Sequence, residues 1–345
     1  MVYREQNGID IQHDKKNEAS YKRVLPGQFV IHLRSFQGGF AYSEVDGITS
    51  PAYTVMSFKN SNEQYGLFWK HIFKSETFIK RLETITYGIR DGRSISFSDF
   101  KSLILQYPSF SEQKMIGDSI AIIERGITLH QCKLEKLKLT KKALLQKLFP
   151  KNGKDIPEIR FKGFIDAWEQ RKFGEIMTFL NGRAYKQDEL LGDGKYKVLR
   201  VGNFYTNDSW YYSNLELDDK FYATNGDLLY TWSATFGPHI WKGEKVIYHY
   251  HIWKLVLQDK IDKLFALHLL EVDKANIMSD KNGSTMVHIT KQGMENKQTI
   301  LPISLNEQKQ IAKFLSSMDK LITLHQRKLE RLQEVKKGLL QKMFV

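Results

Sequence analysis

The sequence of 345 residues has a single cysteine, Cys132, and only 7 prolines. One cysteine excludes a disulfide within the chain, which agrees with a reducing compartment. No stretch approaches the roughly 18 uninterrupted apolar residues that a membrane helix needs, and the opening MVYREQNGIDIQHDKK is too polar for a signal peptide. We therefore expect a cytoplasmic protein with no membrane partner.

The motifs of several enzyme classes are also missing. The sequence has no G-x-x-x-x-G-K-[ST] for ATP, no G-x-G-x-x-G opening a helix, and no N-P-P-[FYW] or D-P-P-[FYW] of the kind that adenine and cytosine amino-methyltransferases use. Paired carboxylates with a downstream lysine, which nucleases use to hold Mg²⁺, are not recognisable in a strand context. The sequence thus predicts no catalytic residue, no metal and no cofactor, and partners would supply any enzymatic activity.

Positive charge is abundant. The chain has 52 Lys and Arg against 39 Asp and Glu, a net charge of +13, which attracts polyanions. Nucleic acid is therefore the first partner to consider, although charge alone does not decide it. Residues 111–149 carry +4 and residues 306–344 carry +5, so most of the charge lies in these two segments. A solvated helix face explains that charge as well as phosphate or partner contact does.

The same two segments form an internal repeat. Aligned without a gap at an offset of 195, they match at 20 of 39 positions, including the runs ITLHQ and LLQK. Each begins with the S-x-x-E pattern of a helix capping box, at Ser109 and Ser304. A repeat of this kind sets the architecture of the chain.

Apolar residues recur in each copy at alternating steps of four and three, which predicts a coiled-coil helix about 58 Å long. Such a helix must bury its apolar stripe, and the equivalent helix in the same chain is the nearest suitable partner. We therefore expect an antiparallel pair with pseudo-twofold symmetry that acts as a spacer. His130 and Lys141, with counterparts His325 and Lys336, are interpreted as register-setting breaks in the seam. The predicted seam comprises Ile116, Ile123, Ile127, His130, Leu134, Leu137, Ile311, Met318, Ile322, His325, Leu329 and Leu332.

A weaker repeat precedes each helix, where PGQFVI at 26–31 resembles NGDLLY at 225–230, a turn glycine followed by a strand. Aromatic-rich segments such as QFVIHLRSF, KYKVLRVGNFY, DLLYTWSA and KVIYHYHIWKLVL predict strands, while LFWKHIFKSETFIKRL and DKLFALHLLEV predict short helices. The fold class is therefore α+β, with two globular modules. The predicted boundaries are 1–108 for the first module, 109–149 for the first helix, 150–159 for a linker, 160–303 for the second module and 304–345 for the second helix.

Loops beside glycines are candidates for DNA contact, because Arg and Gln suit bidentate contacts with guanine and adenine edges. An ordinary polar turn is the simpler explanation of each single loop, and the aromatic residues near Asn203 are more typical of core packing than of base contact. His249 and His251 have a spacing that a metal could use on one strand face, but no third ligand is present. The candidate DNA-binding residues are Arg34, Ser35, Gln37, Arg90, Arg93, Arg183, Asn203, Tyr205, Thr231, Ser233, Thr235, Lys281, Asn282 and Ser284.

On these features the sequence resembles the specificity subunits of type I restriction-modification systems. The resemblance rests on the duplicated helix with SEQK…LLQKLF and NEQK…LLQKMF, on RFKGFIDAWEQRKFGEI at 160–176, and on the glycine-strand signal in each module. It implies two target-recognition domains that each read half of a bipartite site in double-stranded DNA. It also implies docking of two methyltransferase subunits and of restriction motor-nuclease subunits, which would hold the catalytic sites.

One departure from the family pattern lies at the amino end. Nothing in the first half matches RFKGFIDAWEQRKFGEI, and Met1 enters the first module near the level of Arg200 in the second. The first module is therefore expected to be incomplete and to read its half-site weakly. The alternative function is a coiled-coil scaffold or decoy that binds methyltransferase subunits without reading DNA competently.

Overall fold

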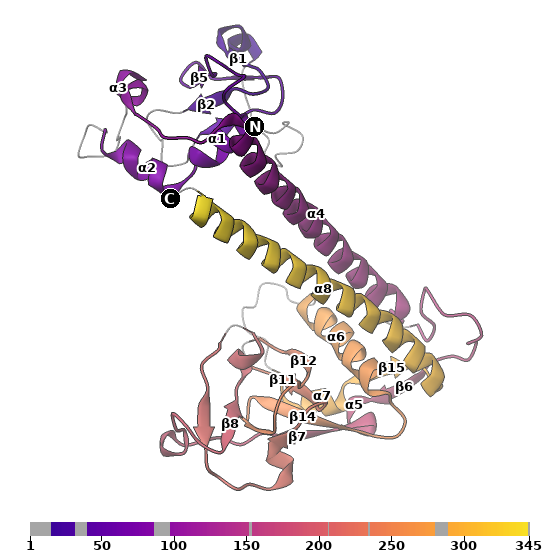
Figure 1. The fold of residues 1–345 in the computed structure, drawn as a ribbon. Coiled ribbons are helices and arrows are strands. Elements are labelled where there is room, and N and C mark those ends of the chain that lie inside the picture. Colours follow the sequence, from indigo (N-terminus) through magenta and orange to yellow (C-terminus); the bar gives the residue numbers. More distant parts are fainter. Residues whose placement is uncertain are drawn as a thin grey trace. The chain divides into compact units, whose positions relative to one another are not determined.

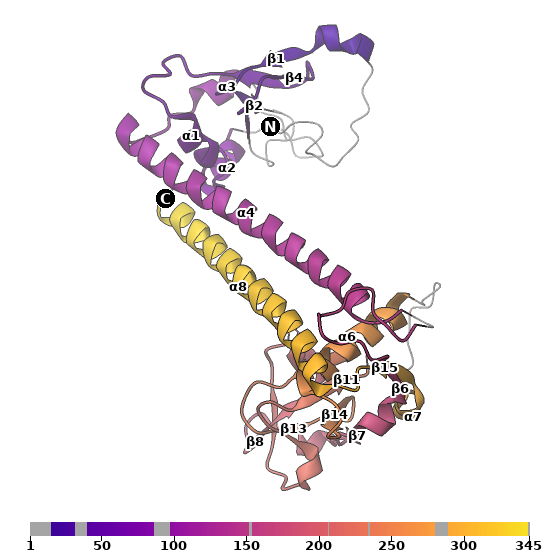
Figure 2. The same cartoon turned by 90° about the vertical axis from the view of Figure 1, so that its right-hand side faces the viewer.

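The computed structural model describes residues 15–31, 40–85, 97–151, 154–205, 207–233, 235–279 and 289–343. Tertiary contacts divide the chain into two compact units. Unit 1 comprises Met1–Lys133 and His325–Val345, and unit 2 comprises Leu134–Leu324. Their elements are labelled in Figure 1 and turned by 90° in Figure 2. Within the described residues no helix is both long and apolar enough to cross a membrane.

Unit 1 combines short strands with three short helices and one end of each long helix. A three-stranded antiparallel sheet has the order β3-β2-β5, and β1 pairs with β4 separately. Its core is rich in phenylalanine, with Phe29, Phe40, Phe68, Phe73 and Phe78 all buried. The elements are η2 (Lys15–Ser20), β1 (Lys22–Val24), β2 (Phe29–Ile31), β3 (Ala41–Tyr42), β4 (Gly47–Thr49), β5 (Thr54–Met56), α1 (Gly66–Ile72), α2 (Glu76–Glu83), α3 (Phe97–Ser102) and α4 (Phe110–Leu148), the last of which continues into unit 2.

Unit 2 contains two four-stranded sheets, ordered β12-β11-β14-β7 and β10-β13-β8-β9, and a β15-β6 pair. Helix α6 packs behind the first sheet, and its residues Phe265 and Leu270 are fully buried. The elements are β6 (Glu169–Lys172), α5 (Phe173–Ile176), β7 (Met177–Asn181), η4 (Gln187–Glu189), β8 (Tyr196–Leu199), η5 (Val201–Phe204), β9 (Tyr211–Ser213), η6 (Asp219–Phe221), β10 (Tyr222–Ala223), β11 (Leu228–Thr231), β12 (Gly237–Ile240), β13 (Val246–Tyr248), β14 (Ile252–Leu257), α6 (Lys263–Ser279), α7 (Lys291–Asn296), β15 (Gln298–Leu301) and α8 (Leu305–Met343), which continues into unit 1.

The two units share two strand pairings in the same register. In unit 1, Phe29 pairs with Met56 across β2 and β5, and in unit 2 Leu228 pairs with Leu255 across β11 and β14. The β1-β4 pair corresponds in the same way to β10-β13. All of these pairs are related by an offset of 199 residues, so the weak sequence repeat before the helices reflects duplicated backbone geometry.

A glycine turn opens each of these equivalent strands. Gly27 has φ +88° and Gly226 has φ +91°, in the left-handed region that favours glycine. The Gly27 amide donates to the Ser43 carbonyl at 2.8 Å, and the Gly226 amide donates to the Trp241 carbonyl at 2.9 Å. These are the two turn glycines that PGQFVI and NGDLLY predict.

One predicted strand is in fact two. The segment KVIYHYHIWKLVL forms β13 in one sheet and β14 in the other, with a turn between Tyr248 and Ile252. The prediction that His249 and His251 share one strand face is therefore wrong, because both lie in this turn. The long apolar run hides the change of sheet, since each half by itself has the pattern of a buried strand.

Each long helix begins at a serine cap. Ser109 Oγ accepts a hydrogen bond from the Glu112 amide, and Ser304 Oγ accepts one from the Glu307 amide, both at 3.4 Å. The buried Glu307 carboxylate of the second box accepts charge-assisted hydrogen bonds from Arg160 at 2.7 and 2.9 Å. The Glu307 side chain thus joins α8 to the segment before β6.

A buried glutamine in the first turn of each long helix makes the same three hydrogen bonds. The side-chain oxygen of Gln113 in α4, and of Gln308 in α8, accepts from a backbone amide, and the side-chain nitrogen donates to two carbonyls. The partners of Gln113 are the Tyr65 amide and the Glu63 and Pro108 carbonyls, and those of Gln308 are the Asp262 amide and the Lys260 and Pro302 carbonyls.

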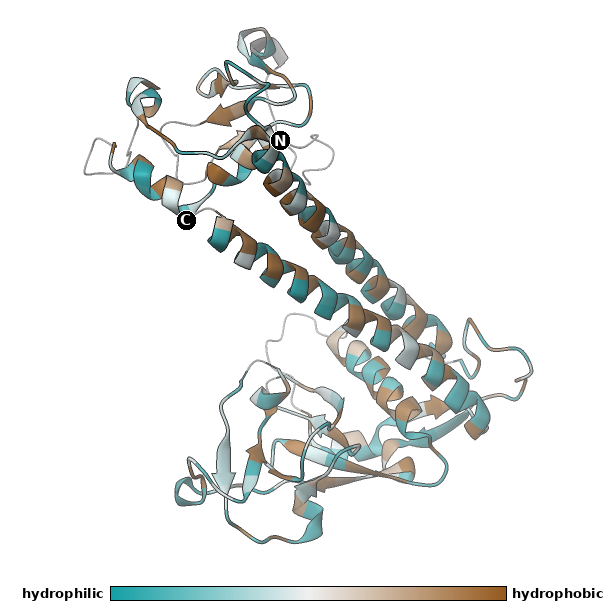
Figure 3. Cartoon of the chain, viewed as in Figure 1, coloured by the Kyte–Doolittle hydropathy of each residue, from teal (hydrophilic) through white to brown (hydrophobic). Residues whose placement is uncertain are grey.

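Within each unit α4 and α8 pack antiparallel. In unit 1, Leu340 packs against the core beside Ile116 and Ile120, and in unit 2, Leu144 packs against the core that holds Leu315. Figure 3 shows brown apolar segments alternating with teal polar ones along both helices. The predicted α+β class and antiparallel helix pair are confirmed.

Polar contacts between the helices are reciprocal. In unit 1 Lys336 pairs with Glu124 at 2.7 Å, and in unit 2 Lys141 pairs with Asp319 at 2.7 Å. Lys141 and Lys336 are equivalent in the repeat, as are Glu124 and Asp319, so each copy supplies the lysine once and the carboxylate once. At His130 and His325 the two copies of one residue meet, with their Nδ1 atoms 2.8 Å apart.

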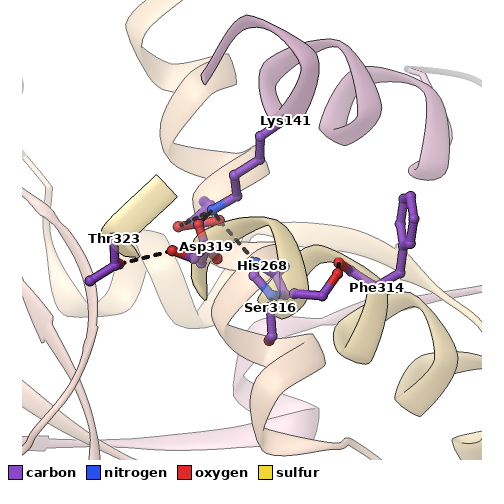
Figure 4. Close-up of polar contacts among 8 residues, drawn as sticks. Lys141, His268, Phe314, Ser316, Asp319 and Thr323 are labelled. Carbon is purple, nitrogen blue, oxygen red and sulfur yellow. Dashed lines mark hydrogen bonds and ion pairs between the residues drawn. The ribbon is translucent and has the colours of Figure 1, made fainter. Parts of the chain in front are cut away.

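Lys141 is the centre of a larger network in unit 2, drawn in Figure 4. Its ammonium lies 2.8 Å from Glu271 and 2.7 Å from Asp319, while His268 contacts Glu271 at 3.0 Å and Ser316 at 3.2 Å. Burial lowers the pKa of Lys141, but the two carboxylates outweigh this and raise it. His268, Glu271 and Asp319 have the donor atoms of a metal site, yet the lysine already supplies the cation between the carboxylates.

Candidate nucleic-acid interface

One edge of unit 2 collects the ends of six strands. Thr231 at the end of β11 pairs with Ile252 at the start of β14 and with Gly237 at the start of β12. Asn181, at the end of β7, pairs with Trp253. We call this the recognition edge and define it as Arg183, Arg200–Tyr205, Thr231–Ser233, Thr235 and His249–His251.

The second sheet reaches the same edge, because β8 and β13 run parallel and end together at Leu199 and Tyr248. An isolated bridge between Arg183 and His249 connects this end to the end of β7. The edge therefore presents turns and loops from both sheets on a scaffold whose strands are buried. Loops held by a rigid scaffold are where binding residues are generally found.

Aromatic rings and imidazoles crowd the middle of the edge. Tyr250 lies between His249 and His251, with ring centroids 4.4 and 3.9 Å away, and Trp232 lies 5.0 Å from His251. Trp232 Nε1 donates to the Tyr250 carbonyl at 2.9 Å, which fixes the ring against the turn. Burial, with His251 and Arg200 adding to it, lowers the pKa of His249 to about 4. Its imidazole is neutral at pH 7.

Arg183 is ion-paired rather than free. Its guanidinium makes two hydrogen bonds to Glu189, at 2.6 and 2.9 Å, and stacks over the Tyr185 ring. The hydrogen bond from Arg183, with the Lys186 amide, lowers the pKa of Glu189 to about 2, so the carboxylate stays charged at any physiological pH. A ligand would have to compete with that carboxylate for the in-plane donors.

Asn203 and Thr231 shape the loops of the edge. Asn203 Oδ1 accepts from the Arg200 amide, and its Nδ2 donates to the carbonyls of Asn207 and Ser209, which closes the loop after β8. Thr231 is fully buried and donates to the Thr235 carbonyl at 2.9 Å. Both side chains use their hydrogen bonds inside the protein.

Tyr205 and Thr235 are exposed at the same edge, and Ser233 is half-buried there. Tyr205 is 44% exposed, with its hydroxyl 3.3 Å from His239 Nε2. His239 stacks on Phe204 at 4.2 Å, and burial followed by Lys274 lowers its pKa to about 4. Because the His239 imidazole is neutral at pH 7, it orients the Tyr205 hydroxyl through a hydrogen bond and not through a charge.

Sequence reasoning missed three groups at this edge: Arg200, Trp232 and Tyr250. Arg200 ends the segment KYKVLR, where a strand passes into a turn, and this position was the available signal for it. Trp232 and Tyr250 lie in segments whose sequence predicts strands. Their rings meet only because of the turn between β13 and β14, which the sequence did not predict.

Several predicted DNA-binding residues lie outside the described residues. They are Arg34, Ser35, Gln37, Arg90, Arg93, Lys281, Asn282 and Ser284. The structure places the remaining six on the recognition edge of unit 2.

The predicted seam residues are all buried or half-buried positions of α4 and α8. Leu134, Ile311, Met318, His325 and Leu329 are the buried ones. The others are half-buried, namely Ile116, Ile123, Ile127, His130, Leu137, Ile322 and Leu332.

The duplicated strand-helix modules and the reciprocal helix pair define a class of two-module proteins built around paired helices. Residues 165–334 match the family model described as Type I restriction modification DNA specificity domain. Residues 165–334 thus form a domain of the type I restriction-modification specificity family.

Two curated relatives come from Methanocaldococcus jannaschii. The chain is 32% identical over 183 residues to the type I restriction enzyme MjaVIII specificity subunit, covering 52% of this chain and 42% of that protein. It is 26% identical over 298 residues to the putative type I restriction enzyme MjaX specificity subunit, covering 82% of this chain and 67% of that protein. The first match thus spans less than half of the relative's length.

Solved structures share the fold. The S subunit of a type I restriction-modification system from M. genitalium superposes with a TM-score of 0.65 at 15% identity, covering 93% of this chain and 84% of that one. A chain from a structure of complex assembly and conformational transition in the type I R-M system superposes with a TM-score of 0.55 at 18% identity, covering 94% and 83%.

Proposed function

We propose that this chain is the DNA sequence-recognition subunit of a type I restriction-modification complex. The observation that carries the proposal is that the family match over residues 165–334 includes the whole recognition edge. That edge combines exposed Tyr205 and Thr235, closely packed rings, and two guanidinium groups that follow strands β7 and β8. Such groups suit contacts with base edges and phosphates of double-stranded DNA.

The duplicated register and the reciprocal helix pair support a bipartite site. Two modules with equivalent strand pairings would each read one half of the site, and α4 and α8 would act as the spacer between them. In this proposal Tyr205, Ser233 and Thr235 contact DNA, while Arg183, Asn203 and Thr231 hold the loops. The predicted loops at Arg34–Gln37, Arg90–Arg93 and Lys281–Ser284 remain proposed DNA contacts.

The proposed partners are two methyltransferase subunits and the restriction motor-nuclease subunits. The chain itself would be non-catalytic and would need no cofactor, because methyl transfer and ATP-dependent cleavage would belong to those partners. The exposed basic faces of α4 and α8 suit either solvent or such partners.

Mapping of modified bases tests this function. Cells that carry the gene together with its methyltransferase partner are expected to show a two-part modified motif that disappears when this gene alone is deleted. A variant with Tyr205→Ala and Thr235→Ala should weaken the motif on one half-site, while Lys162→Ala, in the segment before β6, is the control. An unchanged modification pattern after deletion would instead favour a scaffold or decoy that binds methyltransferase subunits without reading DNA.

A further inference from the structure

We propose that Arg200 is a specificity-determining residue of unit 2 that reads a guanine edge in the major groove. This inference rests on the proposed function and names the base chemistry of one position in the site. Arg200 immediately follows β8, where the two sheets end together at the recognition edge.

The backbone at Arg200 is fixed from the loop that follows. Its amide donates to Asn203 Oδ1 at 3.0 Å, and Asn203 in turn holds the carbonyls of Asn207 and Ser209. The side chain therefore starts from a position that the loop closure determines. A side chain that reads a base needs a fixed backbone position, because its donor atoms must be placed within about half an ångström to hydrogen-bond with a base edge.

The guanidinium of Arg200 differs from the others of unit 2 in lacking an acidic partner. Arg160, Arg171 and Arg183 are ion-paired with Glu307, Glu169 and Glu189 respectively. No carboxylate among the described residues pairs with Arg200, and its Nε is buried without a hydrogen-bond partner there. Within the described part of unit 2, no carboxylate therefore neutralises this charge.

Aromatic stacking sets the plane of the group. The guanidinium carbon of Arg200 lies 4.2 Å from the centroid of the Tyr211 ring. The ring covers one face of the guanidinium and, because Nε is buried, leaves the in-plane N–H groups of Nη1 and Nη2 as the means of binding a ligand. Tyr211 is therefore a positioning residue for Arg200.

The neighbouring groups add no competing charge. His249 lies close enough for Arg200 to contribute to lowering its pKa, and His251 also has a lowered pKa because of burial. Both imidazoles are neutral at pH 7, so neither supplies the missing negative charge. A ligand that supplies an acceptor would therefore meet no competing carboxylate among the described residues.

A planar pair of acceptors fits this group best. Guanine presents O6 and N7 side by side in the major groove, and bidentate contact with them is the commonest specific contact that arginine makes to DNA. A phosphate would also accept hydrogen bonds, but it does not require a plane fixed in advance. The stacked and loop-held geometry favours the base edge.

Selection from a duplex DNA library with a randomised segment tests the inference, using the full chain. The wild type should enrich guanine at a defined position in one half-site. Arg200→Lys keeps the charge but loses the planar fork, so we expect its preference at that position to fall about tenfold. Preferences at the other positions should remain. Tyr211→Leu should weaken the same position, whereas Tyr211→Phe, which keeps the ring, should not.

Arg171→Ala is the matched control, because it removes an equal charge from the separate β6 strand and should leave the selected sequence unchanged. The DNA preference of Arg200→Ala is interpreted only if its thermal unfolding shows that the variant is folded. If it is not folded, the Arg200→Lys result alone tests the inference. A uniform loss of affinity with a smaller salt dependence would mean a phosphate contact and would overturn the inference. A wild type that selects no sequence would overturn the proposed function as well.

Discussion

His130 and His325 are equivalent residues of the two repeats, and their side chains contact each other. Their Nδ1 atoms are 2.8 Å apart, so one ring must donate a proton to the other, and both cannot be protonated while the contact persists. Burial lowers the pKa of His325, with smaller contributions from Lys133, His130 and Lys328. Protons therefore bind the unfolded chain better. The stabilisation is complete above the ordinary histidine pKa of about 6.5 and is lost as the pH falls below it.

Replacing both histidines by leucine, which suits a coiled-coil seam, should reduce this pH dependence. We expect the unfolding temperature of the wild type to fall between about pH 8 and about pH 5 by more than that of the His130→Leu/His325→Leu variant. Other buried histidines, such as His71 and His239, titrate in both proteins, so only the difference is diagnostic. Parallel curves for the two proteins would contradict the prediction.

The turn glycines allow a second residue-scale prediction. Gly27 and Gly226 have positive φ but open space around the position of a Cβ, so alanine there meets backbone strain and no clash. Each substitution should lower the free energy of unfolding by about 1 kcal/mol. Chemical denaturation measures this, with Gly192→Ala as the control, because Gly192 has equally open space and no positive φ. Equal effects at all three sites would show that the turns are not strained.

At the scale of residues, the sequence predicted which positions would gather at the edge better than it predicted their roles. Arg183, Asn203 and Thr231 do lie together, but a carboxylate, a loop closure and burial occupy their polar groups. The groups that bind these three side chains lie in other parts of the loops, and only the folded structure brings them close. Arg200 was missed because its unpaired state follows from which carboxylates are absent nearby, and a linear pattern carries no such information.

At the scale of elements, the long helices were the most predictable part of the molecule. A heptad pattern sustained over many turns fixes the helix and its buried side at once. The strands were harder, because their equivalence holds at an offset of 199 while the helices repeat at 195, so no single alignment covers both. The β13–β14 turn was hidden for a related reason, since a change of sheet leaves no mark in a continuous apolar run.

The lysine at the helix crossing gives a prediction at this scale. Lys141 is 12% exposed and pairs with two carboxylates, while Lys336 is 30% exposed. Lys141→Met would leave Glu271 and Asp319 without their shared cation and should destabilise unit 2 by about 1–3 kcal/mol. Lys336→Met is the matched change in the other copy and should cost less. Denaturation curves give the difference.

Neutralising the carboxylates tests the cause. Adding Glu271→Gln and Asp319→Asn to Lys141→Met should recover part of the lost stability, because no buried charge then remains unpaired. If the triple variant is less stable than Lys141→Met alone, the lysine contributes through packing rather than through charge.

At the scale of the whole molecule, the division into units crosses the helices instead of following their ends. Unit 1 needs residues His325–Val345 as well as Met1–Lys133. The sequence placed domain boundaries where composition changes, at the ends of the repeats. Those domain boundaries remain predictions.

Ending the chain at Leu324 should therefore affect the two units differently. Without α8 beyond that point, Ile116 and Ile120 lose the neighbouring Leu340. Hydrogen exchange should speed up in the α4 segment Phe110–Lys133, while the β7, β11 and β14 amides of unit 2 stay protected. Equal acceleration in both units would show that they unfold as one body.

Unit 1 is built from two separate stretches of the chain, and this affects when each unit can fold during synthesis. Unit 2 is one continuous stretch, so it can fold as it leaves the ribosome, but unit 1 also needs residues His325–Val345. At about 5–20 residues per second, the 212 residues that follow Lys133 take about 10–40 s to make. Throughout that interval the apolar side of the first helix has no second helix to cover it. A nascent chain of this protein therefore leaves that apolar surface uncovered until residues His325–Val345 have been made.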